Sequence, residues 1–125
     1  MVVPPELRTE LEEARLGLRA LYRAMDQSHI AQHLPPKVRR LFELDADFAE
    51  ALWVLDQPSR LYNLSQMVRD TRASLARLSP ALEDFLASLA PEERRSLERD
   101  AKGVRKELPR EAAYLDISGR HPKRP

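Results

Sequence analysis

Cysteine is absent from the sequence and glycine is scarce, and both facts narrow what the protein can do. Without cysteine, disulfide bonds, thiolate metal sites and thiol catalysis are excluded, and the composition suits a reducing compartment. With 3 glycines in 125 residues, no glycine-rich loop is present that could cradle a phosphate group. No apolar run approaches the roughly 18 residues of a membrane helix, and residues 1–6 lack the features of a signal peptide. We therefore expect a cytoplasmic protein without a membrane span.

The composition that remains is typical of a folded helical domain. Hydrophobic residues make up 42% of the chain and charged residues 33%, a balance that favours a globular protein over a disordered one. The 10 prolines fall between segments of helical periodicity, and no segment alternates as a half-buried strand would. We predict a single all-α domain over residues 1–117, followed by a flexible basic tail over residues 118–125.

A helical hairpin over about residues 36–78 is the predicted centre of this domain. Each arm carries apolar residues at steps of three and four, which places them on one face of a helix. The break falls at Gln57-Pro58-Ser59, where Pro58 disfavours helix before it and Ser59 can cap the next helix. So short a connection makes the two arms antiparallel neighbours. The pattern predicts a bundle of four to five helices built on this central antiparallel hairpin.

The flanking segments supply the other predicted helices. A helix opening at Pro4-Pro5 carries a three-heptad apolar seam that ends at Met25, and residues 26–34 form a connector. Ser79-Pro80 and Ala90-Pro91 each have a proline where a first helical turn tolerates it, and Ser79 can also serve as a cap, so each pair predicts a new helix start. Pro109 should end the last of these helices.

Several large apolar residues do not fit the predicted core stripes. Trp53, near the hairpin tip, is expected in the core, where large aromatic side chains contribute most, with an exposed anchor for a partner as the alternative. The set that we assign to partner binding consists of Leu16, Tyr22, Phe42 and Trp53. Because uncovered apolar patches usually mark interfaces, we expect self-association as a homodimer and contact with a protein partner.

Basic residues concentrate near the C-terminus. Residues 94–110 hold seven basic residues against three acidic ones, and a helix, a tight turn and a basic helix have the outline of a major-groove reader. The candidate nucleic-acid-binding residues are Arg94, Arg95, Arg99, Lys102, Arg105, Lys106, Arg120, Lys123 and Arg124. Acidic residues interleave with them, so ion pairs within the helix are the alternative interpretation.

Two groups of polar residues invite a metal-site interpretation that the sequence does not complete. His29 and His33 are four residues apart and would share a face of an α-helix, but a third ligand would have to come from elsewhere. The acidic run of Glu43, Asp45, Asp47 and Glu50 lacks the Glu-x-x-His pairs of a di-metal bundle and is better explained as a solvated helix face.

We therefore predict no metal site, no cofactor and no catalytic residue. No serine lies on a glycine-flanked elbow, and no other nucleophile arrangement is present in the sequence. The sequence favours a non-catalytic protein–protein interaction or regulatory module that self-associates. The alternative is a nucleic-acid-associated protein that uses residues 92–108 and the basic tail.

Overall fold

The protein is all-α. The computed structural model describes residues 5–57 and 61–119, and every regular element in these two ranges is a helix. The elements are α1 (Pro5–Gln27), the 3₁₀ helix η1 (Ile30–His33), α2 (Pro36–Glu43), α3 (Asp45–Leu55), α4 (Leu61–Ala87) and α5 (Pro91–Glu107). None of the described helices combines the length and the apolar character needed to cross a membrane.

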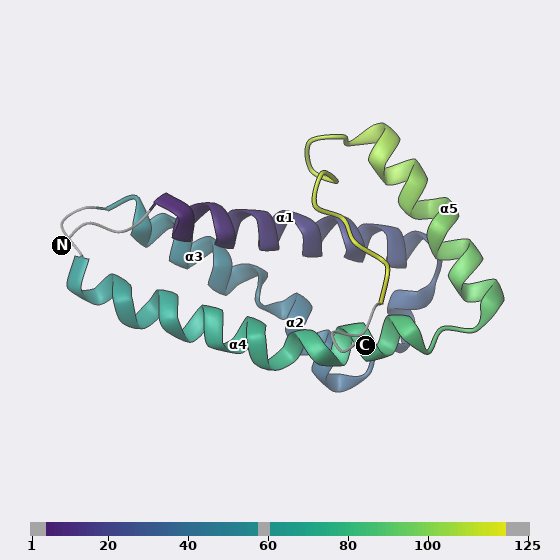
Figure 1. Cartoon of the computed structure of the whole chain (residues 1–125), viewed down its shortest axis with the longest axis horizontal. Coiled ribbons are helices and arrows are strands. Elements are labelled where there is room, and N and C mark those ends of the chain that lie inside the picture. Colours follow the sequence, from purple (N-terminus) through teal and green to yellow (C-terminus); the bar gives the residue numbers. More distant parts are fainter. Residues whose placement is uncertain (1–4, 58–60, 120–125) are drawn as a thin grey trace, which may run out of the picture.

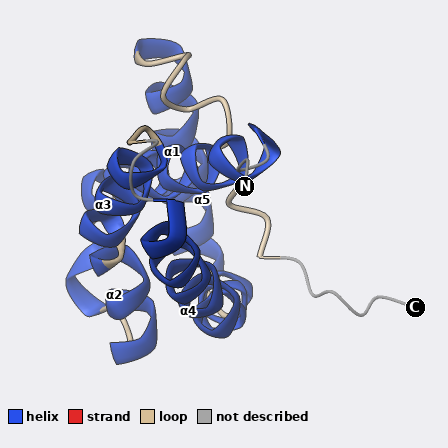
Figure 2. Cartoon of the chain, turned by 90° about the vertical axis from the view of Figure 1, so that its left-hand side faces the viewer, coloured by secondary structure: helices blue, strands red, loops and turns tan. Residues whose placement is uncertain are grey.

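Three rows of helix run side by side. α1 runs in one direction, α2 and α3 return along it, and α4 runs back in the first direction (Figure 1). α2 and α3 pack against α4, and α3 also packs against α1, so that α2 and α3 lie to one side of the other two rows (Figure 2). α5 crosses the end of the molecule at a steep angle and packs on α1.

The second arm of the predicted hairpin is longer than expected, and the predicted helix start at Ser79-Pro80 is wrong. α4 continues through Pro80 for 27 residues. The Ser79 hydroxyl donates to the Leu75 carbonyl at 2.6 Å, a bond inside the helix rather than a cap. Leu78 and Leu86 are both buried, so the apolar face passes the proline without a break. Burial of that face outweighs the local cost of proline in a helix.

The first arm is divided instead. α2 ends at Glu43 and α3 begins at Asp45, with the buried Leu44 between them. Residues 58–60, which include most of the predicted break between the arms, lie outside the described residues.

The buried side chains form two clusters along the molecule. One cluster joins the first half of α1 to α2, α3 and α4 and contains Leu11, Leu41 and Phe48, all fully buried. The other joins the second half of α1 to η1, α5 and the end of α4. Trp53 belongs to neither, because 56% of it is exposed, and the expectation that it lies in the core is wrong. Phe48 is the aromatic residue that fills the space between the helices.

After α5 the chain returns across α1 to the end of α4 (Figure 1). α5 ends at Glu107, as Pro109 predicted, and the next residues form turns in which the Ala112 amide donates to the Leu108 carbonyl. Two α5 arginines hold this C-terminal segment (residues 108–119). Arg94 donates to the carbonyls of Ile117 and, at 2.9 Å, Leu86, and Arg105 donates to the Leu115 carbonyl at 3.2 Å. Residues 120–125 of the predicted tail lie outside the described residues.

Candidate functional site

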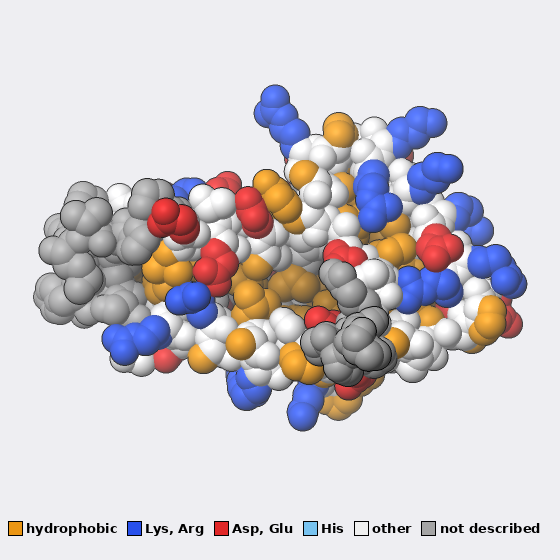
Figure 3. Space-filling view, in the orientation of Figure 1, with side chains coloured by type: hydrophobic (Ala, Val, Ile, Leu, Met, Phe, Trp, Pro, Cys, Tyr) orange, Lys and Arg blue, Asp and Glu red, His pale blue; other side chains and the backbone are white. Residues whose placement is uncertain are grey.

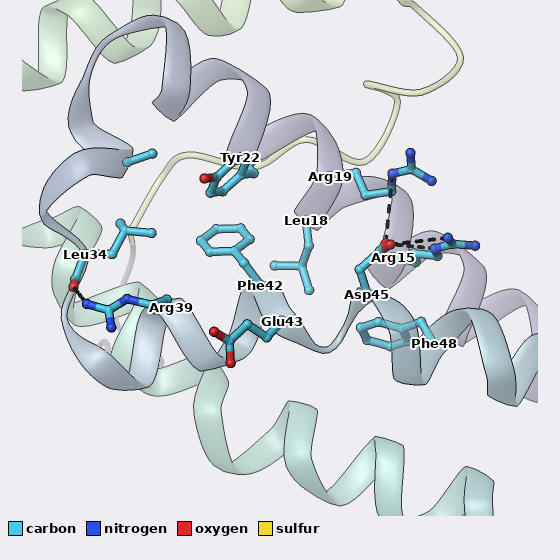
Figure 4. Close-up of a pocket in the computed structure, with 11 residues that line it drawn as sticks. Arg15, Leu18, Arg19, Tyr22, Leu34, Arg39, Phe42, Glu43, Asp45 and Phe48 are labelled. Carbon is cyan, nitrogen blue, oxygen red and sulfur yellow. Dashed lines mark hydrogen bonds and ion pairs between the residues drawn. The ribbon is translucent and has the colours of Figure 1, made fainter.

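A groove opens between α1, η1 and the α2–α3 row (Figure 4). Its volume is about 490 Å³, within the range of about 300–1,000 Å³ that is usual for ligand-binding clefts. The lining residues are Arg15, Leu18, Arg19, Tyr22, Ala31, Leu34, Arg39, Phe42, Glu43, Asp45 and Phe48. Six of the eleven are apolar or aromatic, and the other five are charged.

Aromatic rings form half of the apolar lining of the groove, and Leu18, Ala31 and Leu34 form the rest. Tyr22 from α1 and Phe42 from α2 meet edge to face, with ring centroids 5.3 Å apart and planes at 62°. This geometry is the preferred one for two aromatic rings. Phe48 is fully buried, whereas Tyr22 remains 43% exposed. The pair of Tyr22 and Phe42 therefore lies between the buried core and the solvent, and Tyr22 presents aromatic surface to the solvent.

Charged groups lie on both sides of the aromatic pair, with Arg15, Arg19 and Asp45 on one side and Arg39 on the other (Figure 4). The Arg15 guanidinium donates two hydrogen bonds to the Asp45 carboxylate, at 2.9 and 3.3 Å. Arg19 forms a longer ion pair with the same carboxylate, at 3.9 Å (Figure 4). The hydrogen bond from Arg15 is the main cause that lowers the pKa of Asp45, which stays ionised at neutral pH. Arg39 donates to the Leu34 carbonyl at 3.4 Å. Arg19 keeps 61% of its side chain exposed and is free to meet another anion.

The lining combines apolar side chains with a small excess of positive charge. Three arginines face two carboxylates, which leaves one positive charge in excess, and Asp45 is already neutralised by Arg15. The lining contains no serine, threonine, cysteine, lysine or histidine, and its groups that could exchange a proton are Tyr22, Glu43 and Asp45. The groove can hold an apolar side chain against the rings while an arginine contacts a nearby carboxylate.

The structure brings together two of the four residues that we assigned to partner binding. Tyr22 and Phe42 contact each other in the groove. Leu16 is half-buried on α1 and is not part of the lining, and Trp53 is exposed toward the far end of α3. Sequence reasoning did not assign Arg15 and Arg19, which lie at the edge of the groove (the arginine rim), to a binding site. Their signal was present, since Arg15, Arg19 and Tyr22 follow one another at steps of four and three on α1.

Lys and Arg side chains gather over α5 on the face shown in Figure 3. They divide by role: Arg94 and Arg105 bind backbone carbonyls, whereas Arg99 lies 3.4 Å from Asp100. The basic residues of α5 that are exposed and have neither an ion pair nor a hydrogen bond with another described residue are Arg95, Lys102 and Lys106. The candidates Arg120, Lys123 and Arg124 lie outside the described residues. Nucleic-acid binding by this helix stays a prediction.

The two histidines do not share a face as their spacing suggested. His29 has a left-handed backbone conformation, φ 64°, and precedes η1, while His33 ends this 3₁₀ helix. Residues four apart do not align on a helix with three residues per turn. No group of three or more metal-ligating side chains comes together in residues 5–57 and 61–119. In the acidic run, Glu43, Asp47 and Glu50 are exposed, whereas Asp45 is half-buried against Arg15.

Comparison with known proteins finds no match: no family model, no curated protein and no solved structure is similar to the chain. The groove and the basic surface of α5 are therefore the two features from which a function can be inferred.

Proposed function

We propose that the protein is a non-catalytic interaction module whose docking surface is the groove between α1 and α2–α3. The edge-to-face pair of Tyr22, which is 43% exposed, and the half-buried Phe42 carries this proposal. Aromatic residues that are solvent-exposed and lie in a concave surface are typical of the centres of protein interfaces. A groove of about 490 Å³ accommodates one large side chain of a partner together with its flanking backbone.

The charges of the groove define the partner further. Arg19 is an exposed arginine at the edge of the groove, with 61% of its side chain accessible, and it lies beside an apolar floor. A guanidinium binds a carboxylate through forked hydrogen bonds and also stacks on aromatic faces. The partner segment that fits is an aromatic side chain with a carboxylate next to it.

A short peptide tests this fit. The probe is acetyl-Glu-Trp-Glu-amide, added to the Trp53→Ala protein, so that the peptide carries the only tryptophan in the sample. We expect its emission to shift to shorter wavelength on binding, and we expect the added Arg19→Glu substitution to abolish most of the shift. Acetyl-Lys-Trp-Lys-amide is the matched control. An equal response to both peptides, or no response to either, would show that the groove is not the docking surface.

A second function is supported by a different observation. Arg95, Lys102 and Lys106 are exposed on α5 and have no ion pair with a described residue. Such side chains can bind phosphates, and we expect any affinity for duplex DNA or RNA to fall steeply with salt. A triple substitution of these residues to glutamine should weaken binding uniformly across sequences. Binding that is insensitive to salt or to this change would exclude the second function.

A further inference from the structure

Trp53 is the most exposed large apolar side chain of the described residues, at 56%, and it is the only tryptophan of the chain. A single exposed apolar residue needs no special explanation. Trp53 differs because the acidic residues near it in α3 complement the arginines of the groove in charge, and because α3, which carries Trp53, also supplies Asp45 and Phe48 to the groove.

The surroundings of Trp53 are acidic. Residues 41–56 contain five carboxylates and no lysine or arginine. Asp56 pairs with Arg8 at 3.0 Å, but Asp47 and Glu50 are exposed and have no ion pair with another described residue. An aromatic side chain with carboxylates beside it is the chemistry that the arginine-rimmed groove selects.

Two ion pairs place Trp53 and the groove along the same contact between α1 and α3. Arg8 meets Asp56 three residues after Trp53, and Arg15 meets Asp45 in the groove. Along α3, Trp53 is five residues beyond the groove residue Phe48, an axial rise of about 7.5 Å at 1.5 Å per residue, and it points outward from the core that Phe48 fills. When one chain carries both an exposed tryptophan and a groove, two copies related by a two-fold axis can each insert the tryptophan into the groove of the other.

We propose that the groove is filled by Trp53 of a second copy of the chain. Two copies pack with their α3 helices antiparallel, and each Trp53 enters the groove of the other copy, where Glu50 reaches the arginine rim. This inference rests on the proposed function of the groove and names its occupant. It also explains how a tryptophan can stay outside the core of its own chain: its burial takes place in the dimer.

Concentration dependence gives the first part of the test. From micromolar to submillimolar protein, we expect sedimentation equilibrium to show a monomer–dimer transition, with Trp53 emission shifting to shorter wavelength over the same range. Trp53→Ala should weaken the dimer roughly tenfold or more, as removal of a central interface aromatic does. The control is Tyr114→Ala, which removes an exposed aromatic residue (47% exposed) that does not line the groove. Dimers that survive Trp53→Ala unchanged, or that Tyr114→Ala weakens equally, would overturn the proposal.

A mixing experiment then shows whether the tryptophan of one chain enters the groove of another. The Tyr22→Ala protein keeps Trp53 but has a damaged groove, and the Trp53→Ala protein has an intact groove but no tryptophan. Excess Trp53→Ala protein should shift the emission of the Tyr22→Ala protein to shorter wavelength. The Tyr22→Ala/Trp53→Ala double variant in the same excess should not. No shift in the first mixture, or equal shifts in both, overturns the proposal.

The outcomes separate this inference from the proposed function. If the acidic tryptophan peptide binds the groove while the wild-type chain stays monomeric with constant emission, the groove binds a different partner and only the second-copy inference fails. If the peptide does not bind and the mixture gives no shift, both fail.

Discussion

Gly17 and Gly103 offer the same substitution in two helices of one chain, with opposite expected effects. Gly17 lies within α1, where the C-terminal segment crosses it, and an added Cβ would be 2.7 Å from the Tyr114 carbonyl oxygen. Gly103 lies within α5, and an added Cβ would meet nothing within 4 Å. Gly17→Ala therefore forces backbone to move, whereas Gly103→Ala enters open space.

The magnitudes follow from two opposing effects. Alanine is favoured over glycine inside a helix by about 1 kcal/mol, and this gain applies at both positions. At Gly17 overpacking costs about 1–3 kcal/mol, because the crowded neighbour is a backbone carbonyl that cannot change rotamer. We expect Gly103→Ala to stabilise the fold by about 0.5–1 kcal/mol and Gly17→Ala to destabilise it by up to about 2 kcal/mol.

Urea unfolding of both variants at one protein concentration measures the difference, since any association changes the apparent stability. Hydrogen exchange of the Leu115 amide, which donates to the Ala112 carbonyl at 3.1 Å, reports the C-terminal segment itself. That amide should exchange faster in Gly17→Ala and at an unchanged rate in Gly103→Ala. Equal stabilisation by both substitutions would refute the close crossing of this segment over α1.

Three further predictions concern other contacts. Arg94→Ala removes hydrogen bonds to two carbonyls and should cost about 2 kcal/mol, whereas Arg95→Ala should stay within about 0.5 kcal/mol in thermal unfolding; equal effects would contradict the assignment. Arg15 lowers the pKa of Asp45 below its ordinary value of 3.8, so this pair stabilises the fold above that pH and loses its effect as the pH falls through the folded-state pKa. Asp45→Asn should therefore be less stable than wild type at neutral pH, by under about 1 kcal/mol for this part-exposed pair, and a stability difference that persists at pH 2 in urea titrations would argue against it. Pro80→Ala should raise the melting temperature, because proline inside a helix costs up to about 3 kcal/mol; a lower value would mean that α4 needs this proline.

Apolar periodicity and proline position were enough to locate most helices. The starts of α2 and α5 fall at Pro36 and Pro91, where the pattern placed them. The same signal failed at Pro80, because the apolar face continues in phase on both sides of it. A proline can lie inside a helix when the apolar stripe keeps the same phase before and after it. The Ser-Pro pair alone does not show whether that is so.

The groove was harder to derive from the sequence. Tyr22 and Phe42 stood out as residues off the core stripes, but their contact depends on how α2 crosses α1, which periodicity does not specify. The exposure of Trp53 was missed for a related reason. Phe48 lies on the inner face of α3 and fills the core there, so Trp53 five residues later faces away from it.

The most direct test of the account is an intermolecular distance measurement. Because the chain contains no cysteine, Gln57→Cys gives a single site for a nitroxide label, four residues after Trp53 and outside the contacts proposed for the groove. Nitroxide-labelled protein without isotope enrichment is mixed with ¹⁵N-enriched protein that carries no nitroxide. Any broadening of the observed amide signals then arises from a nitroxide on another chain. The account predicts broadening at Leu18, Tyr22 and Phe42 in the groove. Broadening confined to α5, or none at concentrations where dimers form, would contradict it.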